Sequence, residues 1–374
     1  MSEVQNEYIK GYYKDKYSPA KKLVITLNDK DHYTLHYRCL QQCLNQGLIL
    51  EKVYNVLEFD QSPWMEPYIS GNTQRRKKAK NAFEKDFWKL MNNSVFGKTM
   101  EDVRRRQKID LVRVIGEERR LRKLLSDPAF IGRKIFYGAN LLAVHRKQTN
   151  VFMNKPVIVG VSILDLAKYF MYDYWYEHLK KIYGERVKLL YTDTDSLIIE
   201  VETDDVYQDM VDHKELYDFS NYPKEHRLRK AVGEDFIEKN KAVIGLFKDE
   251  SGGRYGEEYA GVRSKAYSFY TLPEIYGSKK GEITEVRKAK GLKKSIVKKD
   301  LHHRLYVSCV LEGKEDISRT GYFLRSDRHR MYQVRQTKRS INPLDTKLWL
   351  TQDRADALPY GDVLLTNNVN CNSL

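Results

Sequence analysis

Long apolar runs are missing from this sequence of 374 residues, and its first segment, MSEVQNEYIKGYYKDKY, lacks the apolar core of a secretory signal. A membrane-spanning helix needs about 20 consecutive apolar residues, so the sequence predicts neither a membrane span nor a signal peptide. Cysteine is also scarce. The four cysteines suit a reducing compartment and offer no disulfide framework: Cys39, Cys43, Cys309 and Cys371. These absences argue against a disulfide-rich secreted domain and against an integral membrane protein.

Clusters of metal-ligating residues are scarce as well, and one group near the N-terminus has the residue types of a zinc site. It consists of His32, His36, Cys39 and Cys43. If this stretch forms one helix, all four side chains lie along a single rod and cannot surround a tetrahedral zinc ion. The preferred interpretation is a helix within YRCLQQCLNQGLIL that carries two buried cysteines, is closed by Gly47, and is followed by a short strand over EKVYNVLEF.

Acidic residues are too few to balance the basic ones, since 51 Asp and Glu stand against 66 Lys and Arg and leave a net charge of +15. Such an excess indicates a polyanionic partner, nucleic acid before membrane. Residues 287–304 carry eight Lys and Arg against Asp300 alone, and residues 319–339 carry seven against Asp327 alone. The second stretch is interleaved with Tyr322, Phe323 and Tyr332, and the first contains the candidate DNA ligands Lys290, Lys293 and Lys294.

We expect these two stretches to follow a DNA phosphate backbone without reading its sequence, with an affinity that falls steeply as salt rises. The alternative interpretation is a nuclear-localisation or merely solubilising stretch.

Two carboxylates stand one residue apart in KLLYTDTDSLIIEVET, which begins at Lys188. Apolar residues alternate on both sides, so residues 187–202 are predicted to form a β-hairpin with Asp193 and Asp195 at its tip. Aspartate is a common turn former, and simple turn chemistry is one interpretation. The other is that divalent cations relieve the repulsion, because Mg²⁺ prefers one or two carboxylates together with substrate phosphates. A pair of such ions, about 3.5–4 Å apart, supports phosphoryl transfer.

Acidic residues are also missing from one face of a predicted helix upstream, within NTQRRKKAKNAFEKDFWKLMNNSVFGKTMEDVRRR at residues 72–106. At about 100° per residue, a single helix places Lys78, Lys85 and Lys89 on one stripe, flanked by Arg75 and Asn93. The opposite face is apolar and consists of Phe83, Phe87, Leu90 and Met91. Solvated faces usually mix Glu with Lys, whereas a purely cationic stripe that ends in an amide is suited to several phosphates at once.

A second long helix is predicted immediately before the carboxylate hairpin. It covers VIVGVSILDLAKYFMYDYWYEHLKKIYG, around residues 157–183. Apolar residues follow a 3.6-residue period from Ile163 to Trp175, with Ser162 as the N-cap and Gly184 as the stop.

Three motifs together resemble the family B DNA polymerases. KLMNNSVFG at residues 89–97 is similar to the K-x-x-x-N-S-x-Y-G element of their fingers, and YTDTDS at residues 191–196 is similar to the Y-x-D-T-D-S element of their palm. KAY at residues 265–267 is similar to the K-x-Y element that holds the primer end. The motifs occur in the family's order. Over roughly residues 20–350 the amino-acid sequence resembles the protein-primed branch, especially polymerases of Polinton/Maverick-type transposons and related viruses.

The resemblance implies a role for each matching residue. Asp193 and Asp195 would be the catalytic metal ligands of a site for two Mg²⁺ or Mn²⁺ ions, and Lys89 would bind the incoming triphosphate. Lys265 and Tyr267 would grip the primer terminus; the alternative is an exposed lysine beside a core tyrosine. The nucleotide site is completed by Asn93 and Phe96 at the nascent base pair and by the supporting cations Lys85, Lys78 and Arg75. At Phe96 the family's usual tyrosine hydroxyl is absent, while the ring is kept.

The family's first catalytic element, D-x-x-S-L-Y-P, is not found. FDQSPW around Asp60 and DFSNYP around Asp218 both have the wrong spacing, and the second comes after the carboxylate turn. There is also no room for the family's proofreading exonuclease. We therefore expect a C-terminal portion of a polymerase that polymerises poorly or not at all by itself, because displaced metal geometry costs orders of magnitude in rate.

The resemblance implies an α+β fold with a right-hand architecture: an antiparallel palm sheet backed by helices, a helical fingers hairpin and a small thumb. The predicted segments are a palm-side segment at 1–71, fingers at 72–115, palm at 116–285, and thumb with the basic C-terminal region at 286–374.

The implied activity is template-directed DNA synthesis from a primer hydroxyl by two-metal phosphoryl transfer. The implied partners are primer-template DNA, dNTPs and a terminal protein that supplies the first hydroxyl, with no membrane, in the nucleus or wherever the element replicates. One alternative is a catalytically inactive remnant that still binds DNA. Another, a reverse transcriptase, also places paired aspartates on a hairpin but gives no reason for KLMNNSVFG.

Overall fold

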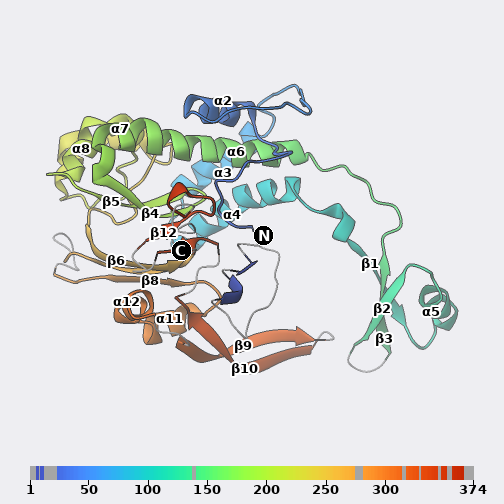
Figure 1. Cartoon of the computed structure of the whole chain (residues 1–374). Coiled ribbons are helices and arrows are strands. Elements are labelled where there is room, and N and C mark those ends of the chain that lie inside the picture. Colours follow the sequence, from blue (N-terminus) through green and yellow to red (C-terminus); the bar gives the residue numbers. More distant parts are fainter. Residues whose placement is uncertain are drawn as a thin grey trace, which may run out of the picture. The chain divides into compact units, whose positions relative to one another are not determined.

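Figure 1 shows the computed structural model of the chain, which describes residues 6–7, 9–11, 23–136, 140–273, 281–313, 317–327, 330–343, 347–351 and 356–365. The chain forms two compact units. Unit 1 consists of Met1–Thr34, Met171–Gly321 and Thr337–Leu374, and unit 2 consists of Leu35–Phe170 and Tyr322–Gln336. Within the described ranges no helix is both long and apolar enough to cross a bilayer. The four predicted segments remain a prediction.

Unit 2 begins with the predicted N-terminal helix, α2 (Tyr37–Asn45), which ends two residues before Gly47, as expected. His36 is its N-cap and His32 lies in the bend before it, so the single helix through all four metal-ligating residues that was considered above does not form. Cys39 and Cys43 are half-buried rather than buried, and the Cys39 thiol donates to the Asp165 carbonyl at 3.1 Å. Cys371 lies outside the described residues.

The strand predicted over residues 51–59 does not form, because this stretch has no regular secondary structure in the fold. Its alternating apolar side chains have no neighbouring strand to pair with, and several are exposed. Val56 is 84% exposed and Leu57 is 70% exposed. Alternation is sufficient for a strand only where a partner strand accepts its backbone hydrogen bonds.

Residues 66–99 form a helical hairpin rather than the single helix assumed for residues 72–106. The first helix is α3 (Glu66–Lys77) and the second is α4 (Ala82–Thr99). Asn81 interrupts them, because its side chain accepts a hydrogen bond from the Glu84 N–H at 2.8 Å and caps α4. Side chains of the two helices then pair in antiparallel order, with Asn72 donating to Asn92 at 2.9 Å.

A small three-stranded module follows the hairpin in unit 2. Its strands lie in the order β1-β3-β2 and both pairs are antiparallel. One face packs against α5 through Val112, Leu124, Leu142 and Val144. The elements are η2 (Val103–Arg105), β1 (Gln107–Arg113), α5 (Glu118–Leu125), β2 (Phe130–Ile135) and β3 (Leu141–Lys147).

The second long helix begins at Val157, the first residue of the predicted stretch. It consists of α6 (Val157–Asp173), the π-helical η3 (Tyr174–Leu179) and α7 (Lys180–Tyr183), and it ends at Gly184 with φ +58°, as expected. Ser162 therefore lies inside the helix and not at its N-cap, since the helix starts directly after Pro156, whose fixed φ suits a helix start. Gly160 lets α6 approach the end of α4, because a Cβ there would lie 2.2 Å from Met100 Cγ.

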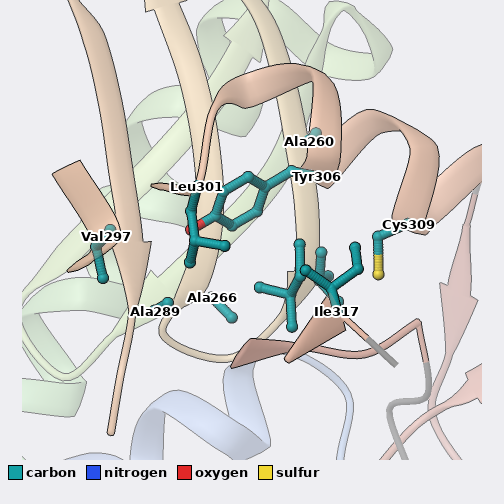
Figure 2. Packing of buried hydrophobic residues seen from close by; sticks show 10 residues of the cluster. Ala260, Ala266, Ala289, Val297, Leu301, Tyr306, Cys309 and Ile317 are labelled. Atoms are coloured by element: carbon teal, nitrogen blue, oxygen red, sulfur yellow. The ribbon is translucent and has the colours of Figure 1, made fainter. Parts of the chain in front are cut away.

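In unit 1, the predicted hairpin is present as β4 (Val187–Asp193) and β5 (Ser196–Val201), which pair antiparallel. A second antiparallel sheet has the order β6-β7-β8, and helices α11 and α12 pack against it around the buried Tyr306 (Figure 2). The bounds are β6 (Gly256–Arg263), β7 (Ala266–Thr271), β8 (Glu285–Ala289), α11 (Lys294–Asp300) and α12 (His303–Leu311), with η4 (Gly184–Arg186) before β4.

The remaining elements of the C-terminal region are short or belong to both units. β9 (Ile317–Asp327) pairs with β10 (Arg330–Ile341), and β11 (Trp349–Leu350) pairs with β12 (Ala357–Leu358). The protein is thus a mixed α+β fold with several small antiparallel sheets, as the predicted fold class requires. The right-hand architecture remains a prediction.

A tyrosine- and histidine-rich core joins the long helix to the segment after β5. The Tyr174 hydroxyl lies 2.9 Å from the Tyr217 hydroxyl, and His178 Nε2 lies 3.1 Å from the same oxygen. Burial lowers the pKa of His178. The elements after β5 are α8 (Val206–Asp212), η5 (Lys214–Leu216), α9 (Arg227–Val232) and α10 (Glu234–Asn240).

His226 caps α9 inside this core. Its Nδ1 accepts a hydrogen bond from the Leu228 N–H at 3.3 Å, and its ring lies against Tyr207 and Tyr222. The side chain is only 3% exposed. Burial, and next to it the positive charge of Arg227, lower the pKa of His226. Protonation of Nδ1 would remove the acceptor, so the ring is neutral in the fold.

We expect unit 1 to lose stability as the pH falls from about 7 to 5. Unfolded histidine titrates near pH 6.5, so below that pH the unfolded chain binds protons that His226 and His178 resist, at up to about 1.4 kcal/mol per pH unit for each proton. His226→Asn keeps a capping oxygen and should flatten the slope by about half, with His178 supplying the remainder. Urea unfolding between pH 5 and 7.5 measures this, and an unchanged slope in the variant would contradict it.

Candidate functional site

The tip of the β4–β5 hairpin is a tight turn that presents two carboxylates. Asp193 pairs with Ser196, which leaves Thr194 and Asp195 as the connecting residues. The Asp195 N–H donates to the Asp193 carbonyl at 2.6 Å, and the Ser196 hydroxyl donates to the same carbonyl at 3.2 Å. Thr194 has φ +56°. A β-branched residue in this region is strained, and such strain persists mainly where function needs the geometry.

The turn between β6 and β7 brings the K-A-Y element to this tip, within unit 1. Lys265 Nζ lies 2.7 Å from Asp193 Oδ2, and the rings of Tyr191 and Tyr267 lie 4.8 Å apart between their centroids. The Tyr259 hydroxyl donates to the Leu190 carbonyl at 3.4 Å and ties β6 to β4. Two sequence elements that were predicted separately therefore form one site.

The positions of the charges in this site follow from those contacts. A hydrogen bond from the Lys265 ammonium lowers the pKa of Asp193, with burial as a weaker opposing effect. Burial, with the nearby Asp193 charge, raises the pKa of Tyr191 to about 12. Burial also raises the pKa of Tyr267. At neutral pH the site therefore holds an ionised Asp193 beside two protonated tyrosines.

The two carboxylates differ in their surroundings. Asp193 is 31% exposed and paired with Lys265, and Thr194 Oγ1 also lies 3.3 Å from its Oδ1. Asp195 is exposed, and no described residue pairs with its carboxylate. Two hard oxygen donors at one turn fit the preference of Mg²⁺ for one or two carboxylates plus substrate phosphates. A group of three or more His, Cys, Asp or Glu side chains that could hold a metal does not occur among the described residues.

Basic residues adjoin the site on one side. The Lys290 N–H donates to the Lys265 carbonyl at 3.1 Å, because β8 pairs with β7 and ends beside the Lys265 turn. Lys290 and Lys293 are exposed on the turn that leads into α11, and Lys294 is the exposed first residue of that helix. The strand order thus brings Lys290, the first of the three lysines predicted to contact DNA, next to the K-A-Y element.

The predicted nucleotide-binding residues lie in unit 2 and are only partly brought together. Lys85, Lys89 and Asn93 lie on one exposed face of α4, and Phe96 is half-buried on the same helix. Asn92, the residue before Asn93, instead faces α3, where its side chain accepts a hydrogen bond from Asn72 and donates one to Thr73. The two adjacent asparagines of KLMNNSVFG therefore differ in role, because Asn92 holds α4 to α3 and Asn93 is exposed.

Arg75 and Lys78 do not continue the stripe, which corrects the single-helix prediction. Arg75 lies on α3 with its guanidinium 5.0 Å from the centre of the Trp88 ring, and Lys78 caps the end of α3. They border an open hollow of about 410 Å³ whose other lining residues are Ala79, Phe83, Glu84, Phe87 and Trp88. Most of the predicted apolar face of the helix is exposed, with Phe83 78% and Leu90 62% exposed, whereas Met91 is half-buried.

The two aspartates rejected as the missing catalytic element have other positions. Asp60 is exposed in the segment without secondary structure. Asp218 is buried in the fold, where it accepts from the Ser220 and Ala242 N–H groups and pairs with Lys248 at 3.1 Å. Its oxygens are therefore used in the local structure.

A second basic surface was missed by motif reading. The three-stranded module holds 13 Lys and Arg against four acidic residues between positions 104 and 147. Arg146 is internal, with ion pairs to Asp110 at 2.7 Å and Asp127 at 2.5 Å, and most of the other basic residues are exposed. A count of charge along the sequence would have found this stretch, which is as basic as the C-terminal third.

Comparison with known proteins adds no family to these observations. The chain matches no protein-family model, and it is not significantly similar to any curated protein or solved structure with which it was compared.

Proposed function

We propose that the chain is the catalytic portion of a template-directed DNA polymerase of the protein-primed family B type, which adds dNTPs to a primer hydroxyl. The observation that carries the proposal is the ion pair of 2.7 Å between Lys265 and Asp193. A turn whose aspartates served only its own shape would need no cation from a distant strand. The convergence of two polymerase-like motifs therefore favours a functional site over turn chemistry.

In this proposal each unit supplies one part of the chemistry. Asp193 and Asp195 hold the metal ions, which when bound activate the attacking oxygen and stabilise the leaving oxygen. The Tyr191 and Tyr267 rings form an apolar wall beside Asp193, suited to the sugar and base of a primer end. On unit 2, Lys85 and Lys89 bind phosphates of the incoming dNTP. The basic surfaces follow the DNA backbone without reading sequence.

The second candidate is a DNA-binding remnant without catalytic activity. It is favoured by one observation, that the hairpin supplies two carboxylates and the described residues contain no group of three metal-ligating side chains. Such a remnant would keep its salt-dependent affinity for DNA through the lysines near Lys290 and the basic module. It would show no specific affinity for dNTPs.

Binding of dNTPs to the full chain tests the proposal. Lys89→Met should weaken the affinity for a fluorescent dNTP in Mg²⁺ by about tenfold to a hundredfold, because a charge-assisted phosphate contact contributes about 1.5–3 kcal/mol. Fluorescence anisotropy with primer-template DNA present measures it.

The matched control is Lys98→Met, which removes the same charge from another face of α4, where Lys98 pairs with Glu101 at 2.7 Å. Its dNTP affinity should equal that of the wild type. Equal losses in both variants, or no measurable dNTP binding by the wild type, would favour the remnant.

A further inference from the structure

Lys265 occupies one oxygen of the Asp193 carboxylate, a group that in the proposed function would hold a metal ion. Its Nζ lies 2.7 Å from Oδ2, which is the distance of a direct charge-assisted hydrogen bond. An ammonium and a divalent cation on the same carboxylate oxygen repel each other strongly at such a distance. Full access of a metal to Asp193 therefore requires that the Lys265 side chain move away.

The surroundings of Lys265 allow its side chain to move while its backbone stays in place. The next residue, Ala266, is 1% exposed and paired with β8, and the Lys265 carbonyl accepts from the Lys290 N–H. The side chain itself is 42% exposed, so it can leave Asp193 without opening the core. The exposed Lys290 follows β8 directly beside the Lys265 turn, so a released Lys265 ammonium would add a second positive charge for an anion there.

We propose that Lys265 is a resident counter-cation of Asp193 and that a divalent cation and the phosphate of a primer end bind cooperatively. The divalent cation requires release of the Lys265 ammonium from Asp193, and the phosphate stabilises the released ammonium. The inference rests on the proposed function, which places the metal at these carboxylates. The DNA phosphate takes the ammonium from Asp193, and the vacated oxygen is then available to the metal. By reciprocity of binding free energies, DNA must tighten metal binding by the same factor as metal tightens DNA binding.

Mn²⁺ binding to the full chain tests this directly, with free Mn²⁺ followed by electron paramagnetic resonance and no nucleotide present. Lys265→Met should bind Mn²⁺ up to about fivefold more tightly than the wild type, the factor expected for loss of a partly exposed ion pair. Primer-template DNA should tighten Mn²⁺ binding to the wild type. It should have little effect on Lys265→Met, because that variant has no ammonium to release.

Two further variants separate this effect from general electrostatics and from folding. Lys188→Met removes one positive charge from an exposed position on the same hairpin and should leave the Mn²⁺ affinity close to that of the wild type. Lys265→Arg keeps a cation beside Asp193 and should keep the DNA-dependent tightening. It therefore provides the second readout if Lys265→Met unfolds.

The outcomes distinguish this inference from the proposed function. If Lys265→Met and the wild type bind Mn²⁺ equally, with and without DNA, the inference is overturned. The metal site itself still stands in that case, provided that Asp195→Asn weakens binding. If the wild type shows no saturable Mn²⁺ binding, or Asp195→Asn and Asp193→Asn leave it unchanged, the inference and the proposed function are both wrong.

Discussion

Asp195→Asn should remove metal-dependent nucleotide addition, lowering its rate by roughly a thousandfold or more. The substitution keeps the shape of the side chain and deletes its charge, at an exposed carboxylate that no described residue pairs with. A bound metal contributes several kcal/mol to a phosphoryl-transfer transition state, and each 1.4 kcal/mol is a factor of ten in rate. The same variant should weaken Mn²⁺ binding by more than tenfold.

Primer extension with a labelled primer, in Mg²⁺ and in Mn²⁺, measures the rate. Because the chain is expected to extend primers poorly, Mn²⁺ binding is measured in parallel and provides a readout that does not depend on turnover. The matched control is Asp204→Asn, an exposed aspartate just beyond the end of β5. Extension that persists in Asp195→Asn, or that falls equally in Asp204→Asn, would show that the carboxylate site is wrongly assigned.

Tyr306→Ala should destabilise unit 1 by about 3–5 kcal/mol, the cost of truncating a large buried aromatic side chain. Tyr306 is fully buried, and Figure 2 shows its ring beside Leu301 in the middle of the cluster. Its hydroxyl donates to the Lys288 carbonyl at 3.0 Å. Ala266 belongs to the same cluster, so the loss should also loosen the Lys265 turn.

Hydrogen exchange of the β7 amides in increasing urea measures this locally, because a single global transition is not assured in a chain of two compact units. Tyr306→Phe keeps the ring and should cost only about 1 kcal/mol for the lost hydrogen bond. Tyr172→Ala removes a tyrosine that is 53% exposed on α6 and should change stability by less than about 1 kcal/mol. A cost for Tyr306→Ala as small as that for Tyr172→Ala would mean that this cluster is not the core of unit 1.

The elements that were predicted correctly are those whose signals are local. The β4–β5 hairpin follows from alternation of apolar residues on both sides of a turn, and the helix ends at Gly47 and Gly184 follow from the left-handed backbone that glycine adopts at φ +92° and +58°. These signals depend on residues that are close together in the sequence. They need no information on tertiary contacts.

The predictions that were wrong treated a local sequence pattern as sufficient where neighbouring residues or a partner strand decided the structure. The stripe from Arg75 to Asn93 assumed an unbroken helix, although Asn81 followed by Glu84 is an N-cap signal that could have been recognised. The strand over residues 51–59 had the right alternation and no partner strand. Ser162 looked like a cap, but Pro156 had already started the helix.

The sequence by itself determined the charge excess, the hairpin with its two aspartates, and the separate K-A-Y element, because composition and periodicity are properties of the chain alone. Only the tertiary structure decided that the Lys265 ammonium pairs with Asp193 and that the Lys290 N–H donates to the Lys265 carbonyl. That arrangement depends on the tie between β6 and β4 and on the order β6-β7-β8, which pack residues far apart in sequence. Long-range packing of this kind is set by the burial of clusters such as that around Tyr306, and no local pattern encodes it.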